Sequence, residues 1–149
     1  MDQLTESAAK DIYQGLLEKI GASYFDNDFA SFRQMVHVPH HFSTEGKYFV
    51  IDTTEDLETS FHHFREYLAG LGVTDFIRTC TGAAFLGEDK IMGAHVSDLI
   101  RNGARTREPY EVWSSLDLID GRWKVTGSQN ALSDTSWQAI TFSHGKTRR

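Results

Sequence analysis

The sequence predicts an α+β domain, in which helices from the first half of the chain cover one face of a curved antiparallel sheet built from the second half. Two observations support this fold class. Apolar residues recur at helical spacing before residue 72, and four long extended segments follow, the last two joined as a β-hairpin. The 149 residues amount to about one domain with a single core.

The last hairpin is the clearest signal in the chain. It spans residues 110–131 and turns at Asp120-Gly121, a pair that supplies the two positive-φ positions of a type I′ turn. One face of it is apolar near the turn and polar farther away, which predicts a pocket with an apolar floor. From the turn outward, this face pairs Leu118 with Trp123, Leu116 with Val125, Ser114 with Gly127, Val112 with Gln129 and Tyr110 with Ala131.

The first half of the chain reads as helices interrupted by a short hairpin. Apolar residues every three or four positions define the helices, and glycine, proline and capping residues mark their ends. The expected elements are a helix over 5–23, a short helix over 29–36 ended by Pro39, strands at 40–43 and 47–51, and a helix from an Asp52 cap to Gly72.

Two further strands are expected at 73–86 and at 91 to about 105, joined by a turn at 87–90. If Leu86 faces Ile91 across that turn, one face of this central hairpin carries chemically useful side chains. This face would hold Arg78, Cys80, Gly82 and Ala84 beside Gly93, His95, Ser97 and Leu99. A one-residue bulge in either strand would exchange the faces.

Composition excludes several function classes. The 21 acidic and 15 basic side chains give a net charge of -6, which argues against a nucleic-acid partner. The N-terminus lacks the pattern of a signal peptide and no segment is apolar enough to span a bilayer, so we expect a cytoplasmic protein with no membrane partner. The pairs His40-His41 and His62-His63 point their neighbouring side chains apart, so we expect no metal and no cofactor.

Two residues are candidates for catalysis. His95 lies in an apolar mid-strand setting that suits a general acid or base, and its alternative role is a satisfied core or interface histidine. Arg78 is placed to bind a substrate carboxylate with two parallel hydrogen bonds. Its alternative role is a structural ion pair with Asp98 or Asp75.

Five more residues are candidates for ligand binding. Ser114 and Gln129 follow from the hairpin register, which places them beyond the apolar floor. Tyr24, Tyr48 and Tyr110 could donate hydroxyl hydrogen bonds to an oxyanion, although packing at a pocket rim explains these tyrosines equally well.

The chain resembles the nuclear-transport-factor-2-like superfamily, in particular its SnoaL-like branch. The resemblance rests on residues 24–29, on the helix 54–71 followed by Gly72-Val73, and on the hairpin residues 118–125, and it extends over about residues 4–132. It implies a cone-shaped, strongly curved sheet with about three N-terminal helices packed on its concave face, enclosing an apolar cavity. We therefore expect one SnoaL-like domain at 1–133 and a C-terminal extension at 134–149 whose end is disordered.

The resemblance leaves two function classes open. In the first, the protein binds a small hydrophobic molecule and acts as a cofactor-free lyase, isomerase or cyclase by acid–base chemistry, with His95, Arg78 and a tyrosine handling protons and an oxyanion. In the second, it is a non-catalytic binding or assembly module, such as a ring-hydroxylating dioxygenase small-subunit-like protein. Trp113 and Ile119 on the outer sheet face predict a homodimer in either case.

Overall fold

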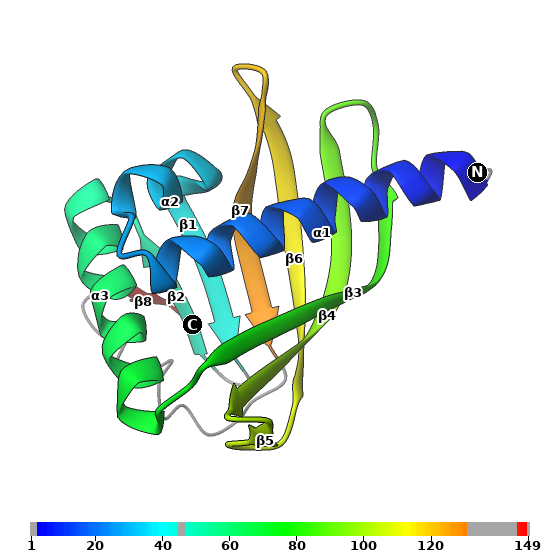
Figure 1. Cartoon of the computed structure of the whole chain (residues 1–149). Helices are drawn as coiled ribbons and strands as arrows, with labels where there is room; N and C mark the ends of the chain where they lie inside the picture. Colours follow the sequence, from blue (N-terminus) through cyan, green and yellow to red (C-terminus); the bar gives the residue numbers. More distant parts are fainter. Residues whose placement is uncertain (1–2, 45–46, 131–145, 149) are drawn as a thin grey trace.

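The computed structural model describes residues 3–44, 47–130 and 146–148. Three helices lie against the concave side of a strongly curved sheet, and α1 crosses the strands at a steep angle (Figure 1). The helices are α1 (Gln3–Phe25), α2 (Phe29–Met35) and α3 (Thr54–Leu71). The strands are β1 (Val36–Thr44), β2 (Lys47–Ile51), β3 (Asp75–Phe85), β4 (Lys90–Arg101), β5 (Ala104–Arg105), β6 (Tyr110–Ile119), β7 (Arg122–Asn130) and β8 (Lys146–Arg148).

The sheet is mixed, whereas the sequence predicted a wholly antiparallel one. Its strand order is β3-β4-β6-β7-β1-β2-β8, with β5 paired to β4. Strands β1 and β7 are parallel neighbours, because they belong to two separate hairpins. The chain between them, which includes α3 and the β3–β4 hairpin, supplies the long crossover that a parallel pair requires.

The helix ends follow the expected chemistry with two corrections. The α3 helix is capped by Thr53, whose hydroxyl oxygen accepts a 3.0 Å hydrogen bond from the Asp56 N–H, so the prediction of Asp52 was off by one residue. Gly72 ends α3 in the left-handed conformation, as predicted. Helix α2 ends at Met35 and not at Pro39, which instead lies within β1 after a cis peptide bond.

The β6–β7 hairpin keeps the predicted register only near its turn. Leu118 faces Trp123 and Leu116 faces Val125, and both Asp120 and Gly121 have positive φ as a type I′ turn requires. Beyond that point Thr126 is an extra residue in β7. This bulge shifts the remaining pairs by one, so the prediction beyond Leu116 was wrong.

One consequence of the bulge is that the far half of β7 turns over. Ser128 now faces Ser114, and Asn130 faces Val112. Gln129 moves to the outer face opposite Trp113, where it is exposed. At the turn itself Leu118 is 39% exposed, because the tip of the hairpin projects beyond the body of the molecule (Figure 1).

The central hairpin departs from the predicted register in two steps of one residue each. Phe85 faces Ile91 in place of Leu86, and an extra residue at Thr81 then shifts the pairing by one more, so the total shift of two residues restores the predicted face. Cys80 consequently faces His95 and Arg78 faces Ser97, so these four share the concave face as predicted. On the turn side of the bulge the prediction was wrong, because Gly82 and Ala84 occupy the opposite face from Gly93.

The Gln14 side chain of α1 is bonded to the backbone of the edge strand β3. The Gln14 amide nitrogen donates to the Arg78 carbonyl oxygen at 2.8 Å, and its oxygen accepts from the Cys80 N–H at 2.7 Å. These are the bonds that a neighbouring strand would make with β3. The amide therefore closes part of an edge that would otherwise present unpaired backbone groups.

Beyond Asn130 the structure describes only Lys146–Arg148, which form β8 and pair antiparallel with β2. The C-terminal residues Trp137, Ile140 and Phe142 lie outside the described residues. Within the described ranges no helix is both long and apolar enough to cross a membrane.

Candidate functional site

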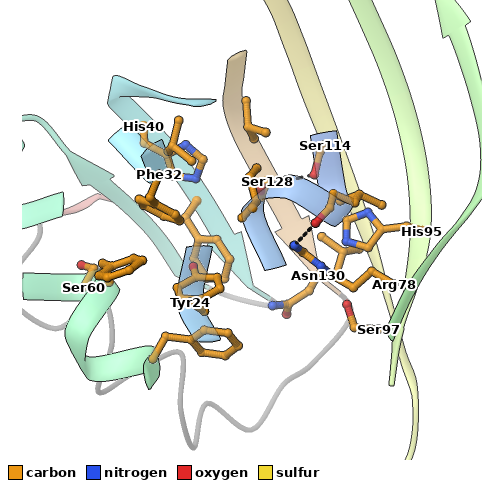
Figure 2. A pocket seen from close by; sticks show the side chains of 18 of the residues that line it. Tyr24, Phe32, His40, Ser60, Arg78, His95, Ser97, Ser114, Ser128 and Asn130 are labelled. Carbon is orange, nitrogen blue, oxygen red and sulfur yellow. Dashed lines mark hydrogen bonds between the residues drawn. The ribbon is translucent and has the colours of Figure 1, made fainter. Parts of the chain in front are cut away.

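A cavity of about 120 Å³ lies between the helices and the concave face of the sheet. Its walls are mainly aromatic and aliphatic side chains from α1, α2 and α3, and its floor is the sheet (Figure 2). An engineered cavity of about 150 Å³ binds benzene, so this space is on the scale of one small ring. The polar side chains that line it are Tyr24, His40, Ser60, Arg78, His95, Ser97, Tyr110, Ser114, Ser128 and Asn130, and Figure 2 labels all of them except Tyr110.

The polar groups of the floor form rows across neighbouring strands. Arg78, Ser97 and Tyr110 stand side by side on β3, β4 and β6. The next row runs from His95 through Val112 to Asn130, and a third places Ser114 beside Ser128. The strand pairing thus gathers residues that are far apart in sequence on one side of the sheet.

Arg78 supplies the positive charge of the cavity. One guanidinium N–H donates to the Leu17 carbonyl oxygen at 2.7 Å, and the group lies 4.5 Å from the centre of the Phe76 ring (Figure 2). Burial of the guanidinium lowers its pKa, which means that its charge is poorly solvated. Four of its five N–H donors have no hydrogen-bond acceptor within the described part of the chain.

The structural ion pair weighed for Arg78 is absent from the described residues. Asp98 accepts a 2.9 Å bond from Arg105, and Asp75 accepts from the Thr74 hydroxyl. The first of these carboxylates is held on the outer face, because Asp98 and Arg78 are on opposite sides of the sheet. Arg78 is therefore a cation in a largely apolar cavity, and no carboxylate of the described residues neutralises its charge.

His95 is held by a tyrosine that the sequence did not single out. The Tyr13 hydroxyl lies 2.7 Å from His95 Nδ1, and both residues are almost fully buried. The close approach is possible because residue 93 is a glycine: a Cβ there would lie 2.5 Å from the Tyr13 ring. The other ring nitrogen, Nε2, makes no hydrogen bond within the described ranges, and His95 lines the cavity.

Burial sets the protonation states of this pair. It lowers the pKa of His95 to about 3, with the nearby Arg78 charge acting in the same direction, so the imidazole is neutral at physiological pH. Burial also raises the pKa of Tyr13 to about 12, against the opposing effect of a hydrogen bond with Ser114. Ser114 in turn lies 3.3 Å from Ser128, oxygen to oxygen. The neutral imidazole is therefore a hydrogen-bond partner for a ligand and a weak base.

His40 lines the cavity from β1, on the side away from Arg78 (Figure 2). It is 6% exposed, and burial lowers its pKa to about 4 although a hydrogen bond to the Val125 backbone opposes the shift. Its Nδ1 atom is buried without a hydrogen-bond partner among the described residues. Buried polar atoms are nearly always partnered, so this nitrogen stands out.

Two of the predicted tyrosines line the cavity and carry aromatic packing. Tyr24 stacks on Phe61 with ring centres 5.1 Å apart and also contacts Phe64, while burial raises the pKa of its hydroxyl. Tyr110 is 7% exposed and receives the Arg107 guanidinium 5.0 Å from its ring centre. Both roles proposed for these residues, hydroxyl donor and packing residue, therefore remain compatible with their positions.

Two other predicted ligand-binding residues lie outside the cavity. The Tyr48 hydroxyl is bonded to His41 Nδ1 and its ring stacks on the His41 imidazole at 16°. The strand alternates its side chains, so Phe49 faces the core and Tyr48 does not. Gln129 is on the outer face because of the Thr126 bulge, and Ser128 and Asn130 occupy the positions expected for it.

Sequence reasoning missed five polar groups near the cavity: Tyr13, His40, Ser60, Ser128 and Asn130. The last two depend on the bulge. Tyr13 was assigned to the apolar stripe of α1, where the available signal was that a buried tyrosine hydroxyl needs a partner. His40 was considered only as a chelating residue, although its alternation with Phe42 predicts an inward position.

The lining residues limit the available chemistry. Within the described part of the chain, no aspartate or glutamate lines the cavity. A carboxylate base of the kind used by ketosteroid isomerases therefore has no counterpart among these residues. What the cavity offers is a cation, a neutral imidazole and several hydroxyls, which together suit the recognition of an oxyanion.

The helices, curved sheet and enclosed cavity define a protein with the NTF2-like, or cystatin-like, fold. No protein-family model and no curated protein sequence matches the chain. Among solved structures, an NTF2-like protein of unknown function from Shewanella oneidensis is 14% identical, with a TM-score of 0.63 over 82% of this chain and 98% of that one.

Two further solved structures show the same architecture. A protein of unknown function with a cystatin-like fold from Nostoc punctiforme is 14% identical, with a TM-score of 0.61 over 85% of this chain and 92% of that one. A protein from Shewanella frigidimarina provisionally named a ketosteroid isomerase is 16% identical, with a TM-score of 0.55 over 78% and 92% of the two chains. At these identities the similarity establishes the fold.

Proposed function

We propose that the protein binds a small aromatic anion, such as a monocyclic carboxylate or enolate, in the cavity between helices and sheet. Arg78 carries this proposal, because it is a cation that reaches an apolar cavity without a carboxylate partner among the described residues. An unpaired charge in such surroundings is costly unless a ligand neutralises it. Arginine also matches the planar geometry of a carboxylate, to which it donates two parallel hydrogen bonds.

The test compares an anion with a neutral molecule of the same shape. Benzoate and benzamide are titrated against the wild-type protein and against Arg78→Met, with binding followed by calorimetry. We expect benzoate to bind at least tenfold more tightly than benzamide to the wild type, and this preference to disappear in Arg78→Met. Arg105→Met is the matched control, since Arg105 pairs with Asp98 on the outer face. Equal affinity for both compounds, or benzoate binding that survives Arg78→Met, would refute the proposal.

A second candidate is acid–base catalysis on the bound anion, and the Tyr13–His95 hydrogen bond favours it. The neutral His95 imidazole and the Arg78 cation could together stabilise an enolate oxygen, as preorganised donors do in enzymes. An enzyme of this kind would let water remove the α-proton of a carbonyl compound while Arg78 and His95 hold the enolate oxygen, and the carbon would then take a proton back from water, without a cofactor. Exchange of the α-hydrogens of a bound aryl ketone with deuterated water, lost in His95→Gln, is the expected result. Exchange no faster than in buffer leaves only binding.

We further propose that the protein is a homodimer joined through the outer face of the sheet. Trp113 and Met92 are 40% and 41% exposed on this face, which the helices leave uncovered. Large exposed apolar side chains on a sheet are typical of association surfaces. The same surface would serve the alternative function as a non-catalytic assembly module, with a different chain as the partner.

A further inference from the structure

His40 and Arg78 lie at opposite sides of one cavity. They belong to β1 and β3, which are separated in the sheet by β4, β6 and β7. Four strand spacings of about 4.8 Å would separate them by about 19 Å on a flat sheet. The sheet is strongly curved, and both side chains line the same cavity from opposite sides (Figure 2).

The His40 imidazole presents a lone pair. Its Nδ1 atom is buried without a partner, and its hydrogen bond to the Val125 backbone therefore involves Nε2. We assign the proton to Nε2, which would donate to the Val125 backbone carbonyl, and Nδ1 of the neutral ring is then an acceptor. The end of the cavity away from Arg78 thus needs a hydrogen-bond donor to complete it.

Between these two polar ends the wall is aromatic. Phe32 and Phe61 have ring centres 4.8 Å apart, and Tyr24 stacks on Phe61 with an interplanar angle of 17°. Such a wall contacts the face or edge of a flat apolar group. The middle of a ligand that reaches both ends is accordingly expected to be a ring.

We propose that the ligand is a single aromatic ring with an anionic group at one end, bound by Arg78, and a hydroxyl or amino donor at the opposite end, received by His40 Nδ1. This inference rests on the proposed function and specifies the ligand class. The donor would satisfy the unpartnered nitrogen, which a ligand with an apolar group in that position would leave buried and unpaired.

The first test uses the wild-type protein and ligands of nearly equal size. The compounds are benzoate, 4-hydroxybenzoate and 4-methylbenzoate, titrated by calorimetry. We expect 4-hydroxybenzoate to bind about tenfold more tightly than 4-methylbenzoate, which is the effect of one well-placed hydrogen bond. Equal or tighter binding of the methyl compound would overturn the inference.

The second test removes the acceptor. In His40→Phe the advantage of the hydroxyl over the methyl compound should vanish, while benzoate affinity stays within about twofold of the wild type. If the variant does not fold, the wild-type His40 Nδ1 resonance is followed by ¹⁵N NMR. It should move on addition of 4-hydroxybenzoate and not on addition of 4-methylbenzoate, and no such difference would also overturn the inference.

The benzoate titration and the comparison of the hydroxyl with the methyl compound test the proposed function and the ligand class separately. If benzoate fails to bind, the proposed function fails and the ligand class falls with it. If benzoate binds through Arg78 but the hydroxyl adds nothing, only the role of His40 is lost.

Discussion

The Tyr13 hydroxyl oxygen lies 2.7 Å from Nδ1 of His95, and this contact joins α1 to the middle of the sheet. The two residues are 82 positions apart in sequence. Gly93 on the same strand as His95 leaves the space that the tyrosine ring fills. The position of the imidazole in the cavity is thus set by Tyr13 and Gly93, neither of which lines the cavity.

Removal of the Tyr13 hydroxyl should lower the stability of the folded protein. In Tyr13→Phe the buried Nδ1 atom of His95 loses its partner, so we expect the free energy of unfolding to fall by about 1–3 kcal/mol. Urea denaturation measures the change. Tyr48→Phe is the control, because its partner His41 is exposed and the loss should stay below about 1 kcal/mol. Similar losses in both variants would contradict a special role for the buried pair.

The glycine beneath Tyr13 should tolerate no side chain. In Gly93→Ala the new Cβ would lie 2.5 Å from the ring and 3.0 Å from the Gly82 carbonyl oxygen, so we expect destabilisation of about 1–3 kcal/mol from overpacking. Gly82→Ala is the matched control on the neighbouring strand, where a Cβ meets nothing within 4 Å. Thermal unfolding should show Gly82→Ala within about 1 kcal/mol of the wild type, since alanine also restricts the unfolded chain.

Stability should depend on pH through the two buried histidines. Burial lowers the folded-state pKa values of His40 and His95 to about 4 and about 3, whereas both titrate near 6.5 when unfolded. Below about pH 6.5 the unfolded chain therefore binds more protons, and the free energy of unfolding falls as the pH falls. Between pH 7 and pH 5 each histidine should lower the free energy of unfolding by about 2 kcal/mol. This free energy continues to fall until the pH reaches the folded-state pKa.

Denaturant titrations at pH 7, 6 and 5 measure this dependence. The variant His40→Phe should show about half of the loss seen in the wild type. The control His41→Gln, which changes an exposed residue, should keep all of it. A free energy of unfolding that is flat from pH 7 to pH 5 would mean that both imidazoles are accessible to protons in the folded protein.

Arg78 should lower stability in the absence of a ligand. Replacing a buried charge that lacks a counter-ion with an apolar side chain of similar length removes an unfavourable desolvation, so Arg78→Met is expected to raise the free energy of unfolding by about 1–3 kcal/mol. The lost bond to the Leu17 carbonyl opposes this gain in part. Arg105→Met should change stability by less than about 1 kcal/mol, because its ion pair is exposed. A loss of stability in Arg78→Met would assign the residue a structural role.

The outer face should govern the oligomeric state. We expect a dimeric mass in solution at micromolar concentration, and a monomeric mass for Trp113→Glu, because the charge cannot be buried in an apolar interface. Light scattering after size-exclusion chromatography measures both. Leu118→Glu is the control, since Leu118 is 39% exposed at the hairpin tip and away from this face. A monomeric wild type would refute the dimer.

Local signals in the sequence were enough for the fold. Asp120-Gly121 defined the turn and the pairs next to it, and the helical spacing from Leu57 to Leu71 located α3 to within a residue or two. These signals act over a few positions, where backbone sterics and side-chain alternation decide the structure. The parallel pairing of β1 with β7 was missed, because it depends on contacts between segments far apart in the chain.

Residues of the candidate site were predicted correctly where the predicted strand pairing placed them on the right face of the sheet. Arg78 and His95 were correctly placed on one face, because the observed pairing differs from the predicted one by two residues and side chains alternate with period two, whereas Gln129 was misplaced by a single bulge. Bulges arise from the curvature of the whole sheet, which no short segment encodes. Tyr13 was missed because a tyrosine in an apolar helix stripe shows no sign of what its hydroxyl will meet.

The extra residue at Thr126 opens a route by which such a cavity can change over evolution. If Thr126 paired in the ladder opposite Ser115, the end of β7 would turn over and bring Gly127 and Gln129 inward in place of Ser128 and Asn130. The turn at Asp120-Gly121 and the apolar pairs next to it would keep their partners. Loss of this one bulge, with no residue inserted or deleted, could thus exchange two polar groups of the lining at once, a step that would otherwise take several independent substitutions.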